Sequence, residues 1–153
     1  MDVYKAPAAQ VELPVEVPAR PIRGVILGAI ADLVVSAALF ISFTLFMGAY
    51  MAAKGSSQED VTRFFMSLEQ DNSTLIASYV MGSVGSLMGG YVCARNARVN
   101  EYAYGCVLAT IMSLLSGALE SDLGSLATGI AFTWLAVMAG CHWGRVRNQQ
   151  ERV

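Results

Sequence analysis

Residues 25–50 read VILGAIADLVVSAALFISFTLFMGAY, an apolar stretch in which Asp32 is the only charged residue. A helix of about 20 apolar residues crosses a hydrocarbon core of about 30 Å. Because that core contains no water, the backbone must satisfy its own hydrogen bonds, which makes the stretch helical. Three further apolar stretches approach or reach this length, at about residues 75–94, 102–119 and 124–143. The sequence therefore predicts an all-α integral membrane protein with four transmembrane helices in a compact bundle.

The overall composition excludes several classes of protein. The chain has 153 residues, of which 55% are hydrophobic and 14% charged, with a mean hydropathy of +0.50. A soluble domain carries about 25% charged residues, and a nucleic-acid-binding domain carries a basic excess that a net charge of −2 does not provide. We expect one membrane domain at residues 22–147. It lies between a proline-rich, disordered cytoplasmic tail at residues 1–21 and a short cytoplasmic tail at residues 148–153.

The positions of the basic residues predict the orientation in the membrane. Eight of the ten lie in the N-terminal tail, the second connector and the C-terminus, namely Lys5, Arg20, Arg23, Arg95, Arg98, Arg145, Arg147 and Arg152. Basic residues favour the cytoplasmic side, so both termini are expected there, in the cell inner (plasma) membrane. Arg95, Arg98, Arg145 and Arg147 form a basic rim that determines topology. Binding of anionic lipid headgroups is the functional alternative for these four residues.

The connector after the first span contains the pattern of a short amphipathic helix. Ser57 is followed three residues later by Asp60, a variant of the capping box that begins helices. Apolar residues then recur at helical spacing, beginning with Val61 and Phe64. We expect this extracytoplasmic helix to lie on the membrane surface as an anchor, with a lid or a partner-docking surface as the alternative.

Two parts of the chain resemble each other and predict parallel helical-hairpin repeats. Residues 24–33 align without gaps on residues 105–114, and residues 89–95 resemble residues 139–145. The alternative is a chance match, which low-complexity membrane sequence produces easily. Small residues at four-residue spacing allow close contact between membrane helices. The positions expected to pack in this way are Gly82, Gly85, Ser86, Gly89, Gly90, Gly140 and Gly144.

Asp32 is the strongest candidate for a functional residue. It lies eight residues beyond Gly24, which places it about 12 Å along the helix from that residue. Ser86 and Ser113 are expected at a similar depth, so the three side chains form a candidate polar layer. In the functional interpretation this layer is a titratable site on a proton or ion path. In the structural interpretation Asp32 is a hydrogen-bonding contact between helices.

The sequence contains one histidine and three cysteines near the predicted cytoplasmic ends of the spans. Cys141 and His142 are adjacent, so their side chains point about 100° apart on a helix, and nearby arginines repel a cation. We therefore expect no metal and no cofactor, and we interpret Cys93 and Cys106 as packing residues. No catalytic motif is present, which argues against an enzyme.

These observations predict a non-enzymatic small membrane protein that acts through helix association. It would work as a homo-oligomer or as an accessory subunit of a membrane complex, with lipid and membrane protein as partners and no nucleic acid. The alternative function is a small proton- or ion-coupled transporter that uses Asp32.

Overall fold

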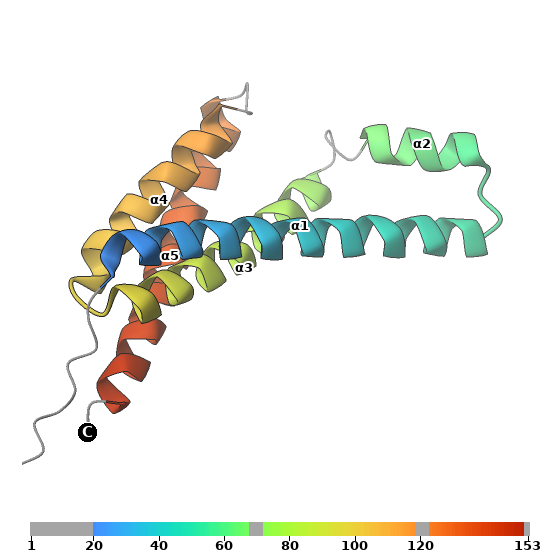
Figure 1. Ribbon diagram of the computed structural model, residues 1–153. Helices are drawn as coiled ribbons and strands as arrows, with labels where there is room; N and C mark the ends of the chain where they lie inside the picture. The colour runs from blue at the N-terminus through green and yellow to red at the C-terminus, as the bar shows by residue number, and fades with distance from the viewer. Residues whose placement is uncertain (1–19, 68–71, 119–122, 152–153) are drawn as a thin grey trace, which may run out of the picture.

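The computed structural model describes residues 20–67, 72–118 and 123–151. All secondary-structure elements in these residues are α-helices (Figure 1). The predicted proline-rich tail falls almost entirely outside the described residues. The five helices are α1 (Pro21–Ala53), α2 (Gln58–Ser67), α3 (Asn72–Ala97), α4 (Glu101–Gly117) and α5 (Leu123–Gln150). The predicted all-helical fold class is confirmed, and α5 extends into the region predicted as the C-terminal tail.

Among the described residues, three helices are long and apolar enough to cross a membrane. They are α1 and the parts of α3 and α5 at Ile76–Ala97 and Gly124–Gln150. Helix α4 has only 17 residues, or about 25 Å at 1.5 Å per residue, and is not among these three. The compact bundle of four transmembrane helices therefore remains a prediction.

Helix α1 is much longer than the part of it that packs. Pro21 occupies the first turn, where its missing N–H is not needed, and a turn at Gly55 with φ of +77° follows the helix. The helix has 33 residues, or about 50 Å, but its buried residues are Gly24, Gly28 and Asp32. Figure 1 shows the second half of α1 extending away from α4 and α5, with α2 at its far end.

Helix α3 is the centre of the fold because it packs against α1, α4 and α5. On the α1 side, Gly24 lies against the backbone of Cys93, and Gly28 lies against the carbonyl oxygen of Gly89. The pairing of an early α1 residue with a late α3 residue shows that the two helices are antiparallel. Helices α1 and α5 make no contact within the described residues.

The other face of α3 packs against α5, and these two helices are parallel. The hydroxyl of Tyr79 donates to the carbonyl of Ser125 at 3.2 Å, and the amide of Asn148 donates to the carbonyl of Ala94 at 2.9 Å. The first contact joins the beginning of α3 to the beginning of α5, and the second joins the end of α3 to the end of α5. Since α3 and α5 run in the same direction, α4 must return the chain between them.

The contact between α3 and α5 is reciprocal. A Cβ added at Gly90 would meet the backbone of Val137, and one added at Gly140 would meet the backbone of Leu87. Positions 90 and 140 correspond in the predicted repeat, and the same offset relates positions 87 and 137. Gly144 lies against the Cβ of Ala94, its own counterpart.

The outer helices of the predicted repeats do not follow the same register. In the predicted repeat, Gly105 is the counterpart of Gly24 and Trp143 is the counterpart of Cys93. Gly24 lies against Cys93, so a matching register would place Gly105 against Trp143. Gly105 lies against Cys141 instead. The α4–α5 pair therefore meets at a different register from the α1–α3 pair. The duplication remains a prediction that the central helices favour and the outer helices do not.

Gly82 does not pack as the sequence predicts. A Cβ added there would meet nothing within 4 Å, whereas one at Gly85 or Gly89 would run into Asp32. The four-residue spacing places Gly82 on the ridge, but no neighbouring helix in the described part of the chain comes within 4 Å of a Cβ at that position. Spacing along one helix does not reveal where its neighbour leaves it.

The predicted helix after α1 is present as α2, and its capping box forms. The backbone N–H of Ser57 donates to the carboxylate of Asp60 at 3.1 Å, and the N–H of Asp60 donates back to the Ser57 hydroxyl at 3.2 Å. These bonds use backbone donors that the first turn of a helix leaves unsatisfied. Asp60 thus specifies where α2 begins.

Candidate functional site

The candidate site lies where α1 crosses α3, around the carboxylate of Asp32. The side chain is buried, with 2% of the residue surface exposed. Ser86 of α3 donates its hydroxyl to Oδ2 at 3.0 Å, and Ser36 of α1 donates to Oδ1 at 3.2 Å. Each carboxylate oxygen therefore has a hydroxyl donor, and the Ser86 bond joins residues of α1 and α3 that are 54 positions apart in sequence.

Glycines of α3 create the space for this carboxylate. A Cβ at Gly89 would lie 2.9 Å from the Cβ of Asp32, and one at Gly85 would lie 2.9 Å from its Oδ1. The Asp32 side chain occupies the helix crossing, and a methyl group at either glycine position would overlap it. The side chain of Asp32 packs directly against backbone that the glycines leave uncovered, and such close contacts are common where membrane helices touch.

Ser113 does not join this polar layer. Its hydroxyl is buried and has no hydrogen-bond partner among the described residues, so it does not bond to Asp32. It lies on the same face of α4 as Gly105, and that face turns toward Cys141 of α5. The sequence alignment gave Ser113 a depth but not a direction. Ser36, one turn after Asp32, takes part instead, and its i, i+4 spacing was a signal in the sequence.

The paired hydroxyls define the chemistry that the site can support. Hydroxyl donors stabilise a carboxylate without a counter-charge, and the same hydroxyls can accept a hydrogen bond from the protonated acid. The site can therefore hold a proton or act as a hydrogen-bonding contact between α1 and α3. Its burial against the backbone of Gly85 and Gly89 favours the second role.

Two of the three cysteines and the histidine, which were candidates for a metal site, lie at contacts between helices. Cys141 donates its thiol to the carbonyl of Gly90 at 3.4 Å, and Cys93 is fully buried beside α1. The hydroxyl of Tyr102 and Nδ1 of His142 form a hydrogen bond of 2.8 Å between α4 and α5. These contacts give Cys93, Cys141 and His142 a place in the packing of the helices.

Arg95 belongs to a polar network that holds the ends of α3 and α5 together. Its guanidinium lies 2.7 Å from the carboxylate of Glu151 and 3.4 Å from Oδ1 of Asn148. Asn148 is only 4% exposed, because its amide also bonds to α3. Sequence reasoning missed this residue, although Asn148 continues the four-residue ridge of Gly140 and Gly144.

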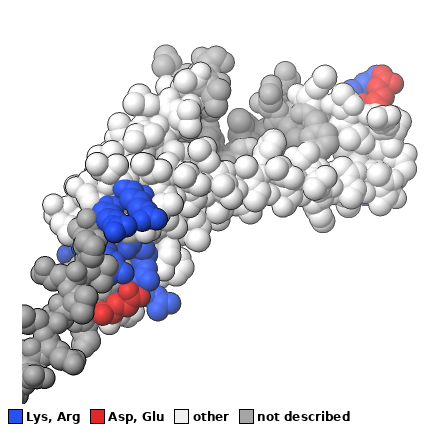
Figure 2. All heavy atoms as spheres, in the orientation of Figure 1, with Lys and Arg blue, Asp and Glu red and all other residues white. Residues whose placement is uncertain are grey.

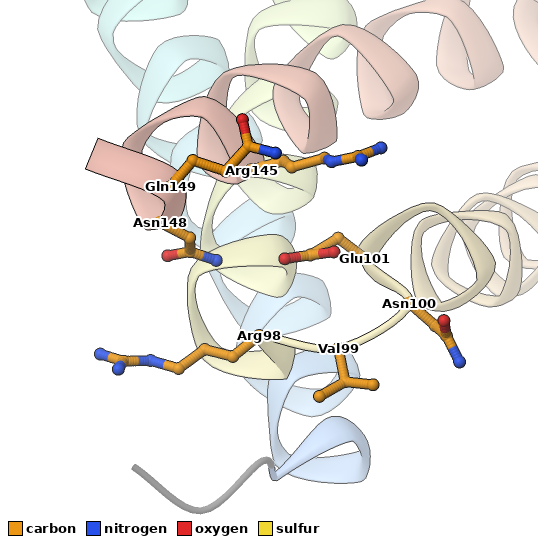
Figure 3. Close-up of a pocket in the computed structure, with 7 residues that line it drawn as sticks. All are labelled: Arg98, Val99, Asn100, Glu101, Arg145, Asn148 and Gln149. Atoms are coloured by element: carbon orange, nitrogen blue, oxygen red, sulfur yellow. The ribbon is translucent and has the colours of Figure 1, made fainter. Parts of the chain in front are cut away.

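The remaining residues of the basic rim lie at the same end of the molecule. Figure 2 shows basic side chains gathered at the end opposite α2. A pocket of about 280 Å³ opens there between the α3–α4 connector and the end of α5 (Figure 3). Its lining residues are Arg98, Val99, Asn100, Glu101, Arg145, Asn148 and Gln149. In Figure 3, Glu101 and Asn148 point toward each other across the pocket, whereas the side chains of Arg98 and Arg145 extend away from it in opposite directions.

Comparison of the chain with protein-family models, with curated proteins and with solved structures found no match. The function is therefore argued from the geometry described above.

Proposed function

We propose that the protein is a non-enzymatic, multi-pass inner-membrane protein that acts through helix association. It works as a homo-oligomer or as an accessory subunit of a membrane complex, with both termini in the cytoplasm. The observation that carries the proposal is the packing of α1. Its buried residues all lie in the first twelve positions, and the 21 residues after Asp32 contain none. Large apolar side chains such as Leu45 and Phe46 are 69% and 68% exposed along that part.

The direction of the helices supports an arrangement with four membrane spans. Helices α3 and α5 lie side by side and parallel, so both cross the membrane in the same sense. The chain must return between them, and α4 is the described helix that does so. Its 17 residues are at the short end of the range for a transmembrane helix. An upright α4 and a strongly tilted α1 accommodate their different lengths in one bilayer.

The environment of Asp32 supports a structural role for the acid. A charged side chain inside a membrane is costly, by at least about 2.5–3.5 kcal/mol, unless it is neutralised or hydrogen-bonded. Two serine hydroxyls meet that need here, and one of them belongs to the neighbouring helix. Asp32 thus orients α1 on α3 and leaves the rest of α1 available to a partner.

Disulfide crosslinking in membranes tests the association. Leu45→Cys places a thiol on the free part of α1, and Leu135→Cys provides a matched control on α5, since the two leucines are 69% and 71% exposed. Cys106 is replaced by alanine in both, because it is only half-buried. We expect Leu45→Cys to crosslink, to a second copy or to another membrane protein, at several times the yield of Leu135→Cys. Equal yields from the two positions would refute the proposal.

A proton- or ion-coupled transporter is the second candidate, favoured by the burial of an acid between hydroxyl donors. Proton flux into proteoliposomes under a pH gradient distinguishes the two functions. Asp32→Asn retains a polar group for Ser36 and Ser86 but does not titrate. We expect equal, background-level flux in the native protein and the variant. Native flux that disappears in a correctly assembled Asp32→Asn protein would establish the transporter.

A further inference from the structure

The two ends of the molecule differ in charge. Six arginines and two glutamates lie at the end where α1 begins and α3 and α5 finish, a net charge of +4 among the described residues. These residues are Arg20, Arg23, Arg95, Arg98, Arg145, Arg147, Glu101 and Glu151. The described charges around α2 balance, with Lys54 and Arg63 against Glu59 and Asp60. Topology explains such an asymmetry, and the same excess of positive charge attracts acidic groups.

Arg23 on α1 and Arg147 on α5 are exposed and make no ion pair with another described residue. Arg95 differs from them, because its guanidinium lies 2.7 Å from the carboxylate of Glu151, just beyond α5. This pair shows that a side chain close to a chain terminus already binds at the basic end. Arg23 and Arg147 are the arginines on which a second acidic segment can act.

Residues 1–19, which precede the described part of the chain, contain such an acidic segment. They hold three acids and one lysine, a net charge of −2. Residues 11–18 read VELPVEVP, in which Glu12 and Glu16 are the only charged residues and each is flanked by apolar ones. The two prolines restrict the backbone, so less conformational entropy is lost when this segment docks. The segment is complementary in charge to the basic end.

The described chain begins at the same end. Gly24 lies against the backbone of Ala97, so Arg20, one turn before Gly24, lies beyond the end of α3. The connector from α3 to α4 follows directly after Ala97, and its Val99 is 49% exposed. The connector therefore offers an apolar contact next to the start of α1.

The length of the segment is sufficient to cross this end of the molecule. An extended chain advances about 3.3 Å per residue, so Glu16 reaches about 13 Å from Arg20 and Glu12 about 26 Å. Helices α1 and α5 both pack on α3, and packed helices lie about 8–10 Å apart, so the axes of α1 and α5 are separated by at most about 20 Å. Glu12 can therefore reach Arg147, whereas Glu16 stays near the start of α1.

We propose that residues 11–18 dock across the basic end, with Glu16 against Arg23 and Glu12 against Arg147. The docked segment covers arginines that a membrane surface or another protein would otherwise contact. The inference uses only the end of the molecule that each residue occupies, so it does not depend on association through α1.

A spin label on the segment, detected by NMR of the full chain in neutral detergent, tests the docking. Gln10→Cys carries the label beside Glu12, in a Cys106→Ala background. Trp143 lies one turn before Arg147, and Trp134, nine residues or about 14 Å earlier on α5, is the internal reference. We expect the label to broaden the indole N–H signal of Trp143 several times more than that of Trp134.

Removal of the two acids separates docking from mere proximity of the label. Glu12→Gln with Glu16→Gln should reduce the broadening of Trp143 about threefold, since exposed ion pairs are individually weak. Asp2→Asn with Glu59→Gln removes two acids elsewhere and should leave the broadening unchanged. Salt should act like the first variant, because the Debye length falls from about 10 Å at 0.1 M to about 3 Å at 1 M. Broadening that none of these changes affects would overturn the proposal.

A charge exchange guards against variants that lose the contact by disturbing the fold. Arg147→Glu should reduce the broadening of Trp143, and Glu12→Arg in the same chain should restore it. A double variant in which the broadening is not restored would refute the pairing of Glu12 with Arg147.

Nanodiscs distinguish the segment from lipid as the occupant of the basic end. We expect the broadening of Trp143 to be similar in phosphatidylcholine and in phosphatidylglycerol. Its complete loss in phosphatidylglycerol would show that anionic lipid takes the arginines instead, which would also overturn the proposal.

Discussion

At the scale of single residues, the close contact of α3 with α5 depends on glycine at a few positions. A Cβ at Gly140 would lie 2.8 Å from the backbone nitrogen of Tyr91 and would also meet the backbone of Leu87. Backbone cannot rotate away as a flexible side chain can. Such a contact is relieved only by separating the two helices.

Gly140→Ala should therefore destabilise the fold, by about 1–3 kcal/mol, the usual cost of overpacking. Gly82→Ala is the matched control on α3, because its Cβ meets nothing within 4 Å. The control should be neutral or stabilising by up to about 1 kcal/mol, since glycine weakens helix interiors. Unfolding of both variants by titration with a denaturing detergent measures the difference. A Gly140→Ala protein as stable as the native chain would contradict the parallel contact.

At the scale of elements, α2 depends on a capping interaction that titrates. The hydroxyl and the backbone N–H of Ser57 hold the pKa of Asp60 below its ordinary value. The interaction therefore stabilises α2 above about pH 3.9, the ordinary pKa of aspartate, and is lost as the pH falls through the lowered value. A raised pKa would give the opposite dependence.

A carboxyl ¹³C titration by NMR measures this pKa directly. We expect Asp60 to titrate below about 3.9 in the native chain and close to that value in Ser57→Ala, which lacks the hydroxyl. The nearby Glu59, which pairs with Arg63 rather than with Ser57, serves as an internal reference for the effect of Ser57→Ala. An Asp60 pKa that does not respond to Ser57→Ala would show that the capping box does not form in solution.

At the scale of the whole molecule, the parallel arrangement of α3 and α5 predicts the topology. If α4 crosses the membrane, the connector at Val99 and the end of α5 at Gln149 lie on one side, and Gln58 lies on the other. If α4 does not cross, Val99 and Gln149 lie on opposite sides.

Cysteine labelling in sealed vesicles of known orientation tests this arrangement. In a Cys106→Ala background, Val99→Cys and Gln149→Cys should react with a membrane-impermeant maleimide from the cytoplasmic face, and Gln58→Cys only from the opposite face. Labelling after the membranes are dissolved controls for the accessibility of each thiol. Reaction of Val99→Cys and Gln149→Cys from different faces would exclude the four-span arrangement.

The sequence by itself determined the helical elements, the start of α2 and the prominence of Asp32. Each of these is a property of neighbouring residues: a continuous apolar stretch, a Ser-x-x-Asp pattern, and one acid among apolar side chains. Such features need no knowledge of what a helix packs against. They predicted the pairing of Asp32 with Ser86 as well, because depth along two helices can be counted from their charged ends.

Only the tertiary structure decided which face of each helix meets a neighbour and where that contact stops. It leaves Ser113 without a hydrogen bond to Asp32, leaves Gly82 open and buries Asn148 between α3 and α5. These outcomes depend on the crossing and the register of helices distant in sequence. Several registers satisfy the same small-residue spacing equally well, and the close fit of side chains against backbone selects one of them.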